Sequence, residues 1–258
     1  MSPKVLLADC ETSPITAHVW GLRLQNVGLN QIRQQPRVIG IASKWLGSKS
    51  VMWRSEYHHS RTEMLEHIHG LLDQADIAVH YNGNGFDIPW LMGEFAREDM
   101  PPPSPFKNID LYRVARKAFR FPSYKLQYVS TALGLEGKLS TGGHELWVQC
   151  LESEGEEQRL AWAKMRRYAK QDTALLEPLF YKLRPHFPAS VNMAVYNPEG
   201  DLACQKCGEV EFLGRRGFAY TAQRAFPQYL CYPERGGCGG WTRDTRSSWG
   251  VQSAGVTR

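Results

Sequence analysis

The sequence contains no apolar run near the roughly 20 residues that a membrane span requires. No basic segment followed by a long apolar stretch comes after Met1, so we expect no secretory signal and a cytoplasmic protein. Cysteine is scarce, with six residues in 258. In a cytoplasmic chain of this length, so few cysteines favour metal ligands or free thiols over a disulfide framework.

An excess of charge of one sign is also lacking, because 31 Lys and Arg residues against 26 Asp and Glu give a net charge of only +5. Hydrophobic residues make up 42% and charged residues 22%, which excludes collagen-like, coiled-coil and wholly disordered chains. The basic residues are unevenly distributed, with five and no acidic residue between positions 111 and 130, and eight against four acidic residues from position 204 onward. Concentrated positive charge indicates a polyanionic partner, nucleic acid first.

The order of the predicted elements indicates an α/β protein. Short apolar runs bounded by turn residues predict strands, and apolar residues at helical spacing predict helices. We expect strands over residues 4–9, 37–45, 50–54, 76–81 and 106–110, and helices over 61–74, from about 87, and over 111–119, 125–133 and 156–182, the last bent or broken near Pro178. The predicted boundaries are an α/β domain over 1–185, a linker over 186–203, a small cysteine-containing domain over 204–246 and a flexible tail over 247–258.

Asp9 and Glu11 lie two residues apart at the predicted end of the first strand. The period of a strand places both carboxylates on the same side of the sheet. Two like charges so close together are unfavourable unless a cation bridges them, and oxygen ligands of this kind suit Mg²⁺ or Mn²⁺. For this short motif alone, an ordinary polar strand end is the more frequent interpretation.

Two further carboxylates follow later elements. Asp87 comes after a strand, a glycine-rich turn and the start of a helix, where an N-cap aspartate is the simpler interpretation. Asp172 occupies a position in the apolar stripe of the long helix where a leucine is expected. An unpaired buried carboxylate is costly, so Asp172 must be protonated, hydrogen-bonded or bound to metal. Tyr168 lies one turn earlier on the same face.

These residues carry a family resemblance. Asp9-x-Glu11, Asn82-x₃-Phe86-Asp87 and Tyr168-x₃-Asp172 resemble the three motifs of the DEDDy branch of the DnaQ-like (DEDD) 3′–5′ exonucleases. The segments 81–91 and 124–135 are similar to the proofreading domain of family B DNA polymerases and its stand-alone relatives. The resemblance covers about residues 4–183 and implies a ribonuclease H-like mixed sheet flanked by helices. We see no polymerase motifs, and 258 residues are too few for a polymerase domain as well.

The resemblance implies a metal-dependent 3′–5′ exonuclease that hydrolyses phosphodiester bonds of single-stranded nucleic acid, with DNA favoured over RNA. The four carboxylates of Asp9, Glu11, Asp87 and Asp172 would hold two Mg²⁺ or Mn²⁺ ions for a two-metal mechanism. Tyr168 would orient the attacking water, because a phenol with a pKa of about 10 is a poor base at neutral pH. Asn82 and Phe86 would position the terminal nucleotide, with a turn-forming asparagine and a core phenylalanine as the alternative interpretation.

Two other functions stay open on the same residues. One is ribonuclease activity at the same site. The other is a catalytically silent nucleic-acid-binding protein that uses the fold as a scaffold, against which the complete set of carboxylates counts. A stripe of basic residues supports a phosphate backbone track, with a solvated helix face as the alternative. The predicted track consists of Arg113, Arg116, Lys117 and Arg120 on one helix face, with Lys125 either contacting a phosphate or extending into solvent at a helix start.

The C-terminal cysteines have the spacing of metal ligands. Cys204-x₂-Cys207 is typical of a zinc knuckle, and Cys231-x₆-Cys238 completes a set of four with a longer gap. The segment resembles a zinc ribbon, so we expect one structural Zn²⁺ in place of a large core, with four free thiols as the alternative. Cys10 and Cys150 are predicted to be buried thiols. The arginines and aromatic residues of this tail suit either nucleic acid or a replication or repair protein as partner.

Overall fold

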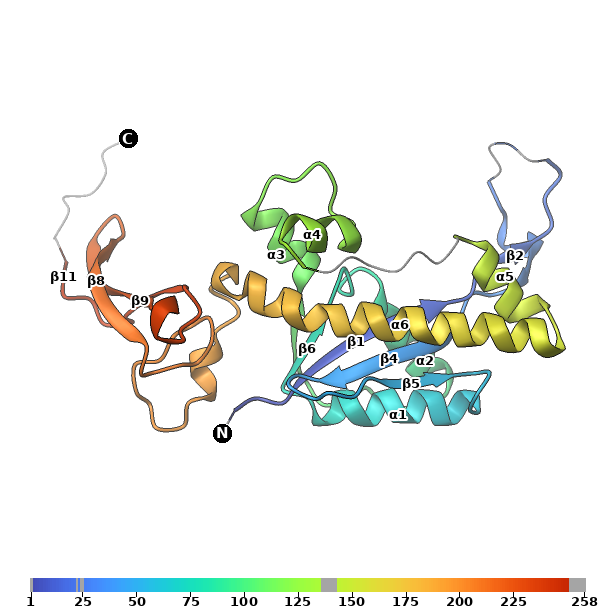
Figure 1. The fold of residues 1–258 in the computed structure, drawn as a ribbon, viewed down its shortest axis with the longest axis horizontal. Coiled ribbons are helices and arrows are strands. Elements are labelled where there is room, and N and C mark those ends of the chain that lie inside the picture. Colours follow the sequence, from blue (N-terminus) through green and yellow to red (C-terminus); the bar gives the residue numbers. More distant parts are fainter. Residues whose placement is uncertain (1, 22, 24–25, 136–142, 251–258) are drawn as a thin grey trace. The chain divides into compact units, whose positions relative to one another are not determined.

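The computed structural model describes residues 2–21, 23, 26–135 and 143–250. They form two compact units (Figure 1). The larger contains residues 4–113 and 121–179, and the smaller contains residues 2–3, 114–120 and 180–250. Among the described helices, none is both long and apolar enough to cross a membrane.

The larger unit is built on a five-stranded mixed sheet of order β5–β4–β1–β6–β7. The strands are β1 (Val5–Thr12), β4 (Val38–Trp45), β5 (Met52–Ser55), β6 (Ile77–His80) and β7 (Lys107–Asp110). Within this sheet, β4 pairs antiparallel with β1 and with β5, and β6 and β7 continue the sheet parallel to β1. Sequence patterning therefore predicted all five strands, because each is a short apolar run bounded by turn residues.

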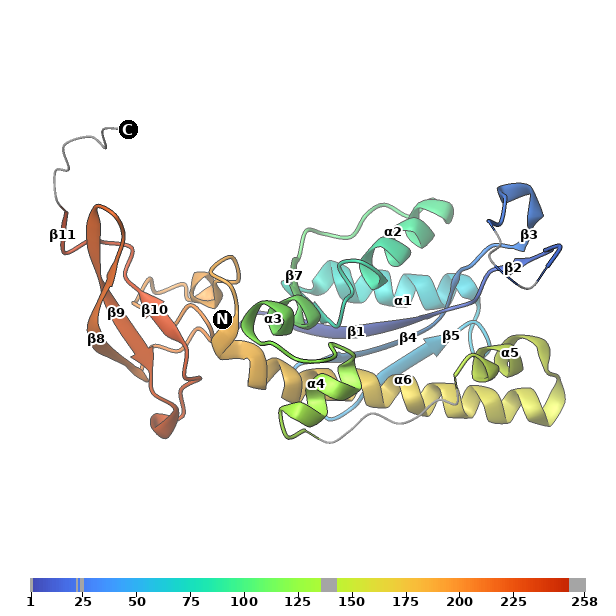
Figure 2. The same ribbon diagram turned by 90° about the horizontal axis from the view of Figure 1, so that it is seen from above.

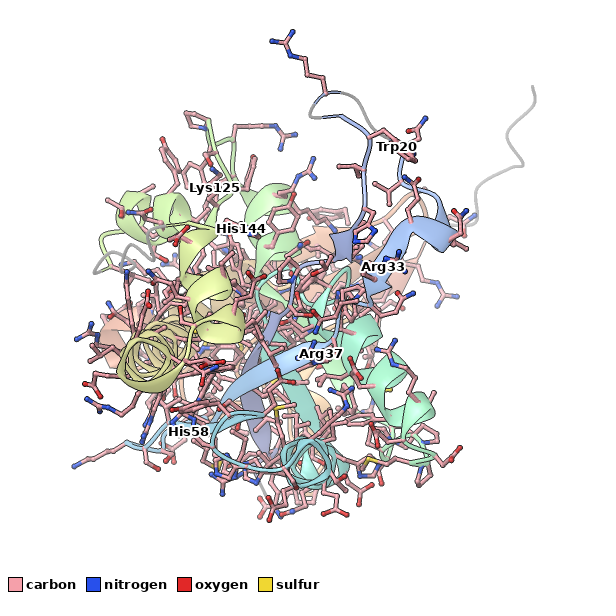
Figure 3. The ribbon with its side chains drawn as sticks, turned by 90° about the vertical axis from the view of Figure 1, so that its right-hand side faces the viewer. Trp20, Arg33, Arg37, His58, Lys125 and His144 are labelled. Carbon is pink, nitrogen blue, oxygen red and sulfur yellow. The ribbon has the colours of Figure 1, made fainter. Side chains whose placement is uncertain are left out.

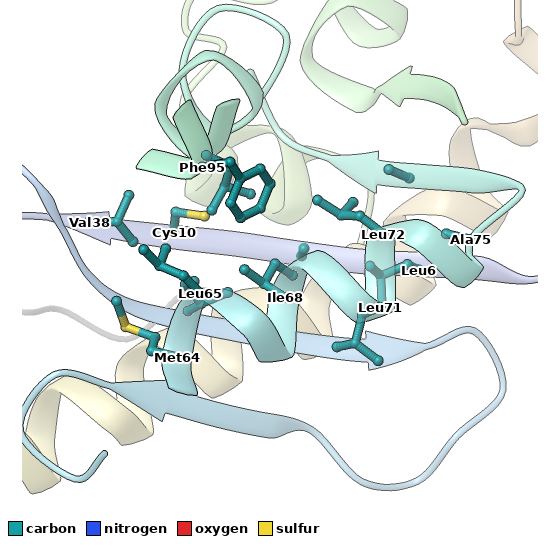
Figure 4. Packing of buried hydrophobic residues seen from close by; sticks show 14 residues of the cluster. Leu6, Cys10, Val38, Met64, Leu65, Ile68, Leu71, Leu72, Ala75 and Phe95 are labelled. Carbon is teal, nitrogen blue, oxygen red and sulfur yellow. The ribbon is translucent and has the colours of Figure 1, made fainter. Parts of the chain in front are cut away.

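Helices cover both faces of this sheet (Figure 2). On one face, α1 (Arg61–Gln74) and α2 (Asp87–Arg97) pack against alternate residues of β1, namely Leu6, Ala8 and Cys10 (Figure 4). On the other face, α5 (Glu145–Glu152) and α6 (Gly155–Leu183) enclose a second core that includes Ala42 of β4. Asp9 pairs with Ala42, so Asp9 and Glu11 project toward the face that α6 covers.

Several elements differ from the expectation. Strand β1 continues to Thr12 instead of ending at Asp9, because residues 10–12 pair with β4. Helix α6 passes through Pro178 without a break, and buried residues on both sides of the proline hold it in place. The short pair β2 (Thr16–Ala17) and β3 (Ile32–Gln34) and the helix α5 were not predicted. Helices α3 (Leu111–Ala118) and α4 (Leu126–Ala132) lie within one residue of the prediction.

The smaller unit carries a four-stranded antiparallel sheet. Its strands are β8 (Leu213–Tyr220), β9 (Arg224–Cys231), β10 (Trp241–Arg243) and β11 (Trp249–Gly250), with β9 pairing to all three others. Preceding it are two 3₁₀ turns, Arg184–His186 and Met193–Tyr196. The four C-terminal cysteines come from the loops and strand ends of this unit, as a zinc ribbon requires. The predicted fold class, a mixed sheet flanked by helices plus a small C-terminal domain, is confirmed.

Candidate active site and metal centre

Asp9 and Glu11 lie on the part of β1 that continues past the end of its parallel neighbour, β6. The pairing of β1 with β6 ends at Leu7 opposite Val79, whereas its pairing with β4 continues through Glu11 opposite Gly40. The two carboxylates therefore lie where β6 has ended and the chain turns toward α2. Glu11 is buried and Asp9 is half-buried, so charge at this edge of the sheet is only partly solvated.

Asp87 is the first residue of α2 and is buried. It is not the N-cap, because that position is taken by Phe86 and has no side-chain capping bond. Instead, Asp87 Oδ1 accepts a hydrogen bond of 2.9 Å from the backbone amide of Cys10. Burial raises the pKa of the Cys10 thiol well above its ordinary value, and the charges of Asp87, Asp9 and Glu11 raise it further. The charges of all three carboxylates therefore act on Cys10.

Burial also raises the pKa of Asp87, to about 6. The hydrogen bond from the Cys10 amide opposes this shift, and the nearby carboxylate of Asp110 adds to it. A buried carboxylate beside other acids is costly when ionised, and a bound cation removes that cost. The site therefore fits a divalent cation by the chemistry of its donors.

Asp110, at the end of β7, was not predicted as part of the site. Its buried carboxylate accepts hydrogen bonds from the backbone amides of Asn82 (2.9 Å) and Tyr112 (3.1 Å). Asn82 has a φ of 66°, in the left-handed region that asparagine tolerates better than most residues. Asp110 thus fixes the turn that leads from β6 to Asp87. No short motif indicates this role, because it depends on strands β6 and β7 lying side by side.

Gly83 makes the same turn tight. A Cβ atom at this position would lie 2.4 Å from His80 Cγ and 2.8 Å from Asp87 Oδ2, closer than real Cβ atoms approach other atoms. At Gly85, the closest atom to a Cβ would be the Asn82 carbonyl oxygen, at 3.7 Å, which is an ordinary contact. The backbone of this turn can approach His80 and Asp87 only because residue 83 has no side chain.

Tyr168 and Asp172 extend from α6 toward β1. Asp172 is buried, and the half-buried Tyr168 hydroxyl forms a hydrogen bond with its carboxylate. Burial raises the pKa of Tyr168 far above its ordinary value, with further contributions from Asp172, Glu11 and Asp9 in that order. The charges of Glu11 and Asp9, both on β1, therefore act on the Tyr168 phenol of α6.

An ion pair holds α6 in this place on the sheet. Lys44 of β4 pairs with Glu177, five residues beyond Asp172 on α6. The second Glu177 oxygen accepts a hydrogen bond of 2.8 Å from the Gly47 amide in the turn after β4. Both contacts connect α6 to the hairpin that carries β4 and β5.

The remaining predicted substrate-binding residues are exposed. Phe86 is 39% exposed and its ring lies 6.1 Å from that of Trp90, so its interpretation as a core residue is wrong. The predicted basic stripe is shorter on the helix than expected, because α3 ends at Ala118. Arg120 follows that end and donates to the carbonyl of Arg116 (3.3 Å). The side chains of Arg113, Arg116, Lys117, Arg120 and Lys125 are all exposed.

The sequence analysis also missed a basic cavity of about 560 Å³ against α6. His58, from the loop between β5 and α1, is one of its lining residues. Figure 3 labels this side chain. The other polar lining residues are Arg159, Arg166, Arg167 and Lys170. The carboxylates of the candidate active site do not line this cavity.

The four C-terminal cysteines form the tightest cluster of ligand atoms. Their Sγ atoms all lie within 4.8 Å of one another, with Cys204–Cys238 and Cys207–Cys231 both at 3.7 Å. Backbone amides donate to three of these sulfurs, which favours the thiolate form that binds metal. Within the described part of the chain, no three carboxylates converge as closely. Cys10 and Cys150 are buried outside this cluster, as predicted.

Comparisons with known proteins support the fold assignment. A family model for the RNase H superfamily matches residues 27–184, a range that contains Asp87, Tyr168 and Asp172 and begins after Glu11. A search of curated proteins found no match.

Among solved structures, the chain is similar to the family B DNA polymerase from the hyperthermophilic archaeon Pyrobaculum calidifontis, with a TM-score of 0.50 and 15% sequence identity. The match covers 89% of this chain and 33% of the polymerase, so this chain spans about a third of that protein's length. At this identity the likeness concerns the fold, and it agrees with the resemblance that the motifs indicate. The family model matches more than half of this chain, and the mixed sheet has the order β5–β4–β1–β6–β7. The chain therefore belongs to the RNase H superfamily.

Proposed function

We propose that this protein is a metal-dependent 3′–5′ exonuclease that acts on single-stranded nucleic acid, with DNA favoured. The observation that supports the proposal is that four acidic residues from three separate elements interact near the end of β1. Asp87 accepts a hydrogen bond from the backbone amide of Cys10, which lies between Asp9 and Glu11 in the sequence, and the charges of Asp172, Glu11 and Asp9 act on the Tyr168 hydroxyl. Such a group of carboxylates does not stabilise the fold of the metal-free protein, because like charges repel and partly buried carboxylates lose solvation. The four are Asp9, Glu11, Asp87 and Asp172.

These carboxylates would hold two Mg²⁺ or Mn²⁺ ions. When bound, such ions stabilise the attacking and leaving oxygens of an in-line phosphoryl displacement. Carboxylate oxygens are suitable ligands for both metals. With a pKa of about 6, Asp87 is mostly ionised at neutral pH and available as a ligand, and a neighbouring cation favours that form further.

Tyr168 acts as a neutral phenol in this proposal. Burial and the surrounding carboxylates hold its pKa above the ordinary value, so it keeps its proton throughout the physiological range. A neutral hydroxyl beside Asp172 can donate one hydrogen bond and accept another, which suits it to orient a water molecule. It cannot serve as the general base at neutral pH.

Exposed side chains would position the substrate. Phe86 offers an exposed ring one residue before Asp87, where a terminal base can stack. Asn82, in the same turn, is also exposed. The exposed cations on and after α3 would contact phosphates, and the four cysteines would hold one structural Zn²⁺.

The experiment that tests the proposal is a time course with single-stranded oligonucleotides labelled at either the 5′ or the 3′ end. With Mg²⁺ or Mn²⁺, we expect a 5′-labelled strand to shorten one nucleotide at a time, and a 3′-labelled strand to release its label at once. EDTA should stop the reaction and added Mg²⁺ should restore it. Shortening from the 5′ end, or cuts within the strand, would contradict the proposal.

DNA and RNA strands of the same sequence decide the substrate class. Faster hydrolysis of DNA is the expected result, whereas hydrolysis of RNA alone would establish the ribonuclease alternative at the same site. If the protein binds both strands but hydrolyses neither under any metal condition, the result would support the alternative of a catalytically silent nucleic-acid-binding protein.

A further inference from the structure

One face of the C-terminal sheet carries a row of aromatic rings. Side chains alternate along β9, and residues paired across strands share a face. Phe218 pairs with Pro227, while Tyr220 and Trp249 both pair with Ala225, from opposite sides of β9. These three aromatic residues therefore lie on one face with Arg215, which pairs with Tyr229. We call this set of four residues the platform face.

The rings of the platform face contact one another and remain accessible. The Phe218 ring centroid lies 4.6 Å from that of Trp249 and 6.4 Å from that of Tyr220. Tyr220 is 73% exposed and Trp249 is 49% exposed. A contiguous row of exposed rings is typical of an interaction site, whereas single exposed rings are ordinary.

Positive charge accompanies these rings. The Arg215 guanidinium lies 4.9 Å from the Phe218 ring centroid, in a cation–π arrangement that leaves its outer donors available. Residues 212–233 include Arg215, Arg216 and Arg224 and contain no Asp or Glu. A hairpin that combines cations with open rings is complementary to a strand with negative phosphates and flat bases. An acidic protein would match the charge but would leave the row of open rings without stacking partners.

The opposite face provides an internal comparison. Phe226 lies there, and the Arg243 guanidinium covers its ring at 4.5 Å. Trp241 is on the same face and is 48% exposed, as much as Trp249. Trp241 pairs with Leu230, however, and the Arg243 guanidinium already covers the Phe226 ring. This face therefore has one exposed ring and no row.

We propose that the platform face binds single-stranded nucleic acid, with bases stacked on Tyr220 and Trp249 and phosphates contacted by Arg215. The site belongs to the cysteine-containing unit and does not depend on the carboxylates being catalytic. It gives the chain a second contact with a strand, independent of the 3′ terminus.

The test is fluorescence anisotropy with a 5′-fluorescein-labelled 20-nucleotide oligothymidylate, using the full zinc-loaded chain without Mg²⁺ or Mn²⁺. Because stacking contributes substantially per base, we expect Tyr220→Ala and Trp249→Ala each to weaken binding by about five- to hundredfold. Trp241→Ala is the matched control and should stay within about twofold of wild type. Tyr220→Phe keeps the ring and should also bind like wild type.

The salt dependence provides an independent readout. Arg215→Gln should reduce the slope of log affinity against log salt by about 0.7, the value for one phosphate contact on a single strand. Unchanged affinity in Tyr220→Ala and Trp249→Ala, or an equal loss in Trp241→Ala, would overturn the proposal. Zinc content and the thermal melting curve of each variant confirm that the unit is folded. Since no turnover is measured, failure here is distinguishable from failure of the exonuclease assignment.

Discussion

At the scale of single residues, burial makes the ionised form of Asp87 unfavourable in the metal-free protein. Asp87 is 4% exposed, and its pKa is raised from 3.8 to about 6, mainly by burial. The folded, metal-free protein thus binds this proton more tightly than the unfolded chain does. The contribution of Asp87 to stability is complete below about pH 4, falls as the pH rises toward 6, and stays low above it.

Asp87→Asn should therefore stabilise the metal-free protein at neutral pH. The asparagine side chain is uncharged, and its amide oxygen can still accept the hydrogen bond from the Cys10 backbone amide. We expect a gain of about 1–3 kcal/mol in the free energy of unfolding at pH 7, shrinking toward zero at pH 4. Urea unfolding at several pH values, without added Mg²⁺ or Mn²⁺, measures this. A variant less stable than wild type at pH 7 would show that the carboxylate is not strained.

Tyr168→Phe separates orientation from packing. The change keeps the ring and removes only the hydroxyl that bonds Asp172. If that hydroxyl orients water, the loss should appear in kcat, by about tenfold or more, with little change in KM. A fall in substrate affinity with unchanged turnover of bound substrate would make Tyr168 a packing residue.

The acidic residues that the sequence predicts for the site each stand out in a local pattern. Asp172 replaces an expected leucine, and Asp9 and Glu11 repeat at the period of a strand, so each carries its own signal. Asp110 carries none, because an aspartate before a helix is common and its bond to Asn82 joins segments 28 residues apart. Contacts of that kind depend on how strands are ordered, which local patterns do not specify.

At the scale of elements, the turn between β6 and α2 controls the position of Asp87. Gly83→Ala places a Cβ against His80 and Asp87, so we expect at least tenfold lower activity and a melting temperature lower by several degrees. Gly85→Ala in the same turn meets only an ordinary contact and is the matched control. Equal effects of the two changes, in activity and melting, would show that the close approach at Gly83 does not matter.

The elements themselves were predictable where their pattern is local. Helix α1 was predicted with its observed bounds, because five apolar residues at helical spacing mark it. In the structure all five are buried, and a capping box at Ser60 begins the helix. The end of β1 was misplaced by three residues because its extension depends on pairing with β4. The β2–β3 arm was missed for a related reason: its strands are short and partly or fully exposed, so they lack the apolar alternation that marks a strand.

At the scale of the whole molecule, the chain combines an RNase H superfamily domain with a separate cysteine-containing unit. If the cysteines hold a structural metal, elemental analysis should find about one zinc per chain. Cys207→Ser should lower that content and unfold the smaller unit, because a unit with so small a core depends on its metal. Cys150→Ala removes a buried thiol outside the cluster and should keep its zinc. Full zinc content in Cys207→Ser would contradict the assignment.

The most direct test of the central claim compares wild type with Asp172→Asn in single-turnover hydrolysis of a 5′-labelled strand in Mg²⁺. Asp73→Asn is the matched control, because Asp73 is a carboxylate on α1 that accepts hydrogen bonds from the backbone amide and the hydroxyl of Ser104. Removing a group that stabilises charge in a transition state commonly lowers the rate by about 10²–10³-fold. We expect a loss of at least that size for Asp172→Asn and a rate near that of wild type for Asp73→Asn. If Asp172→Asn hydrolyses the strand as fast as wild type, the acidic cluster is not the catalytic centre.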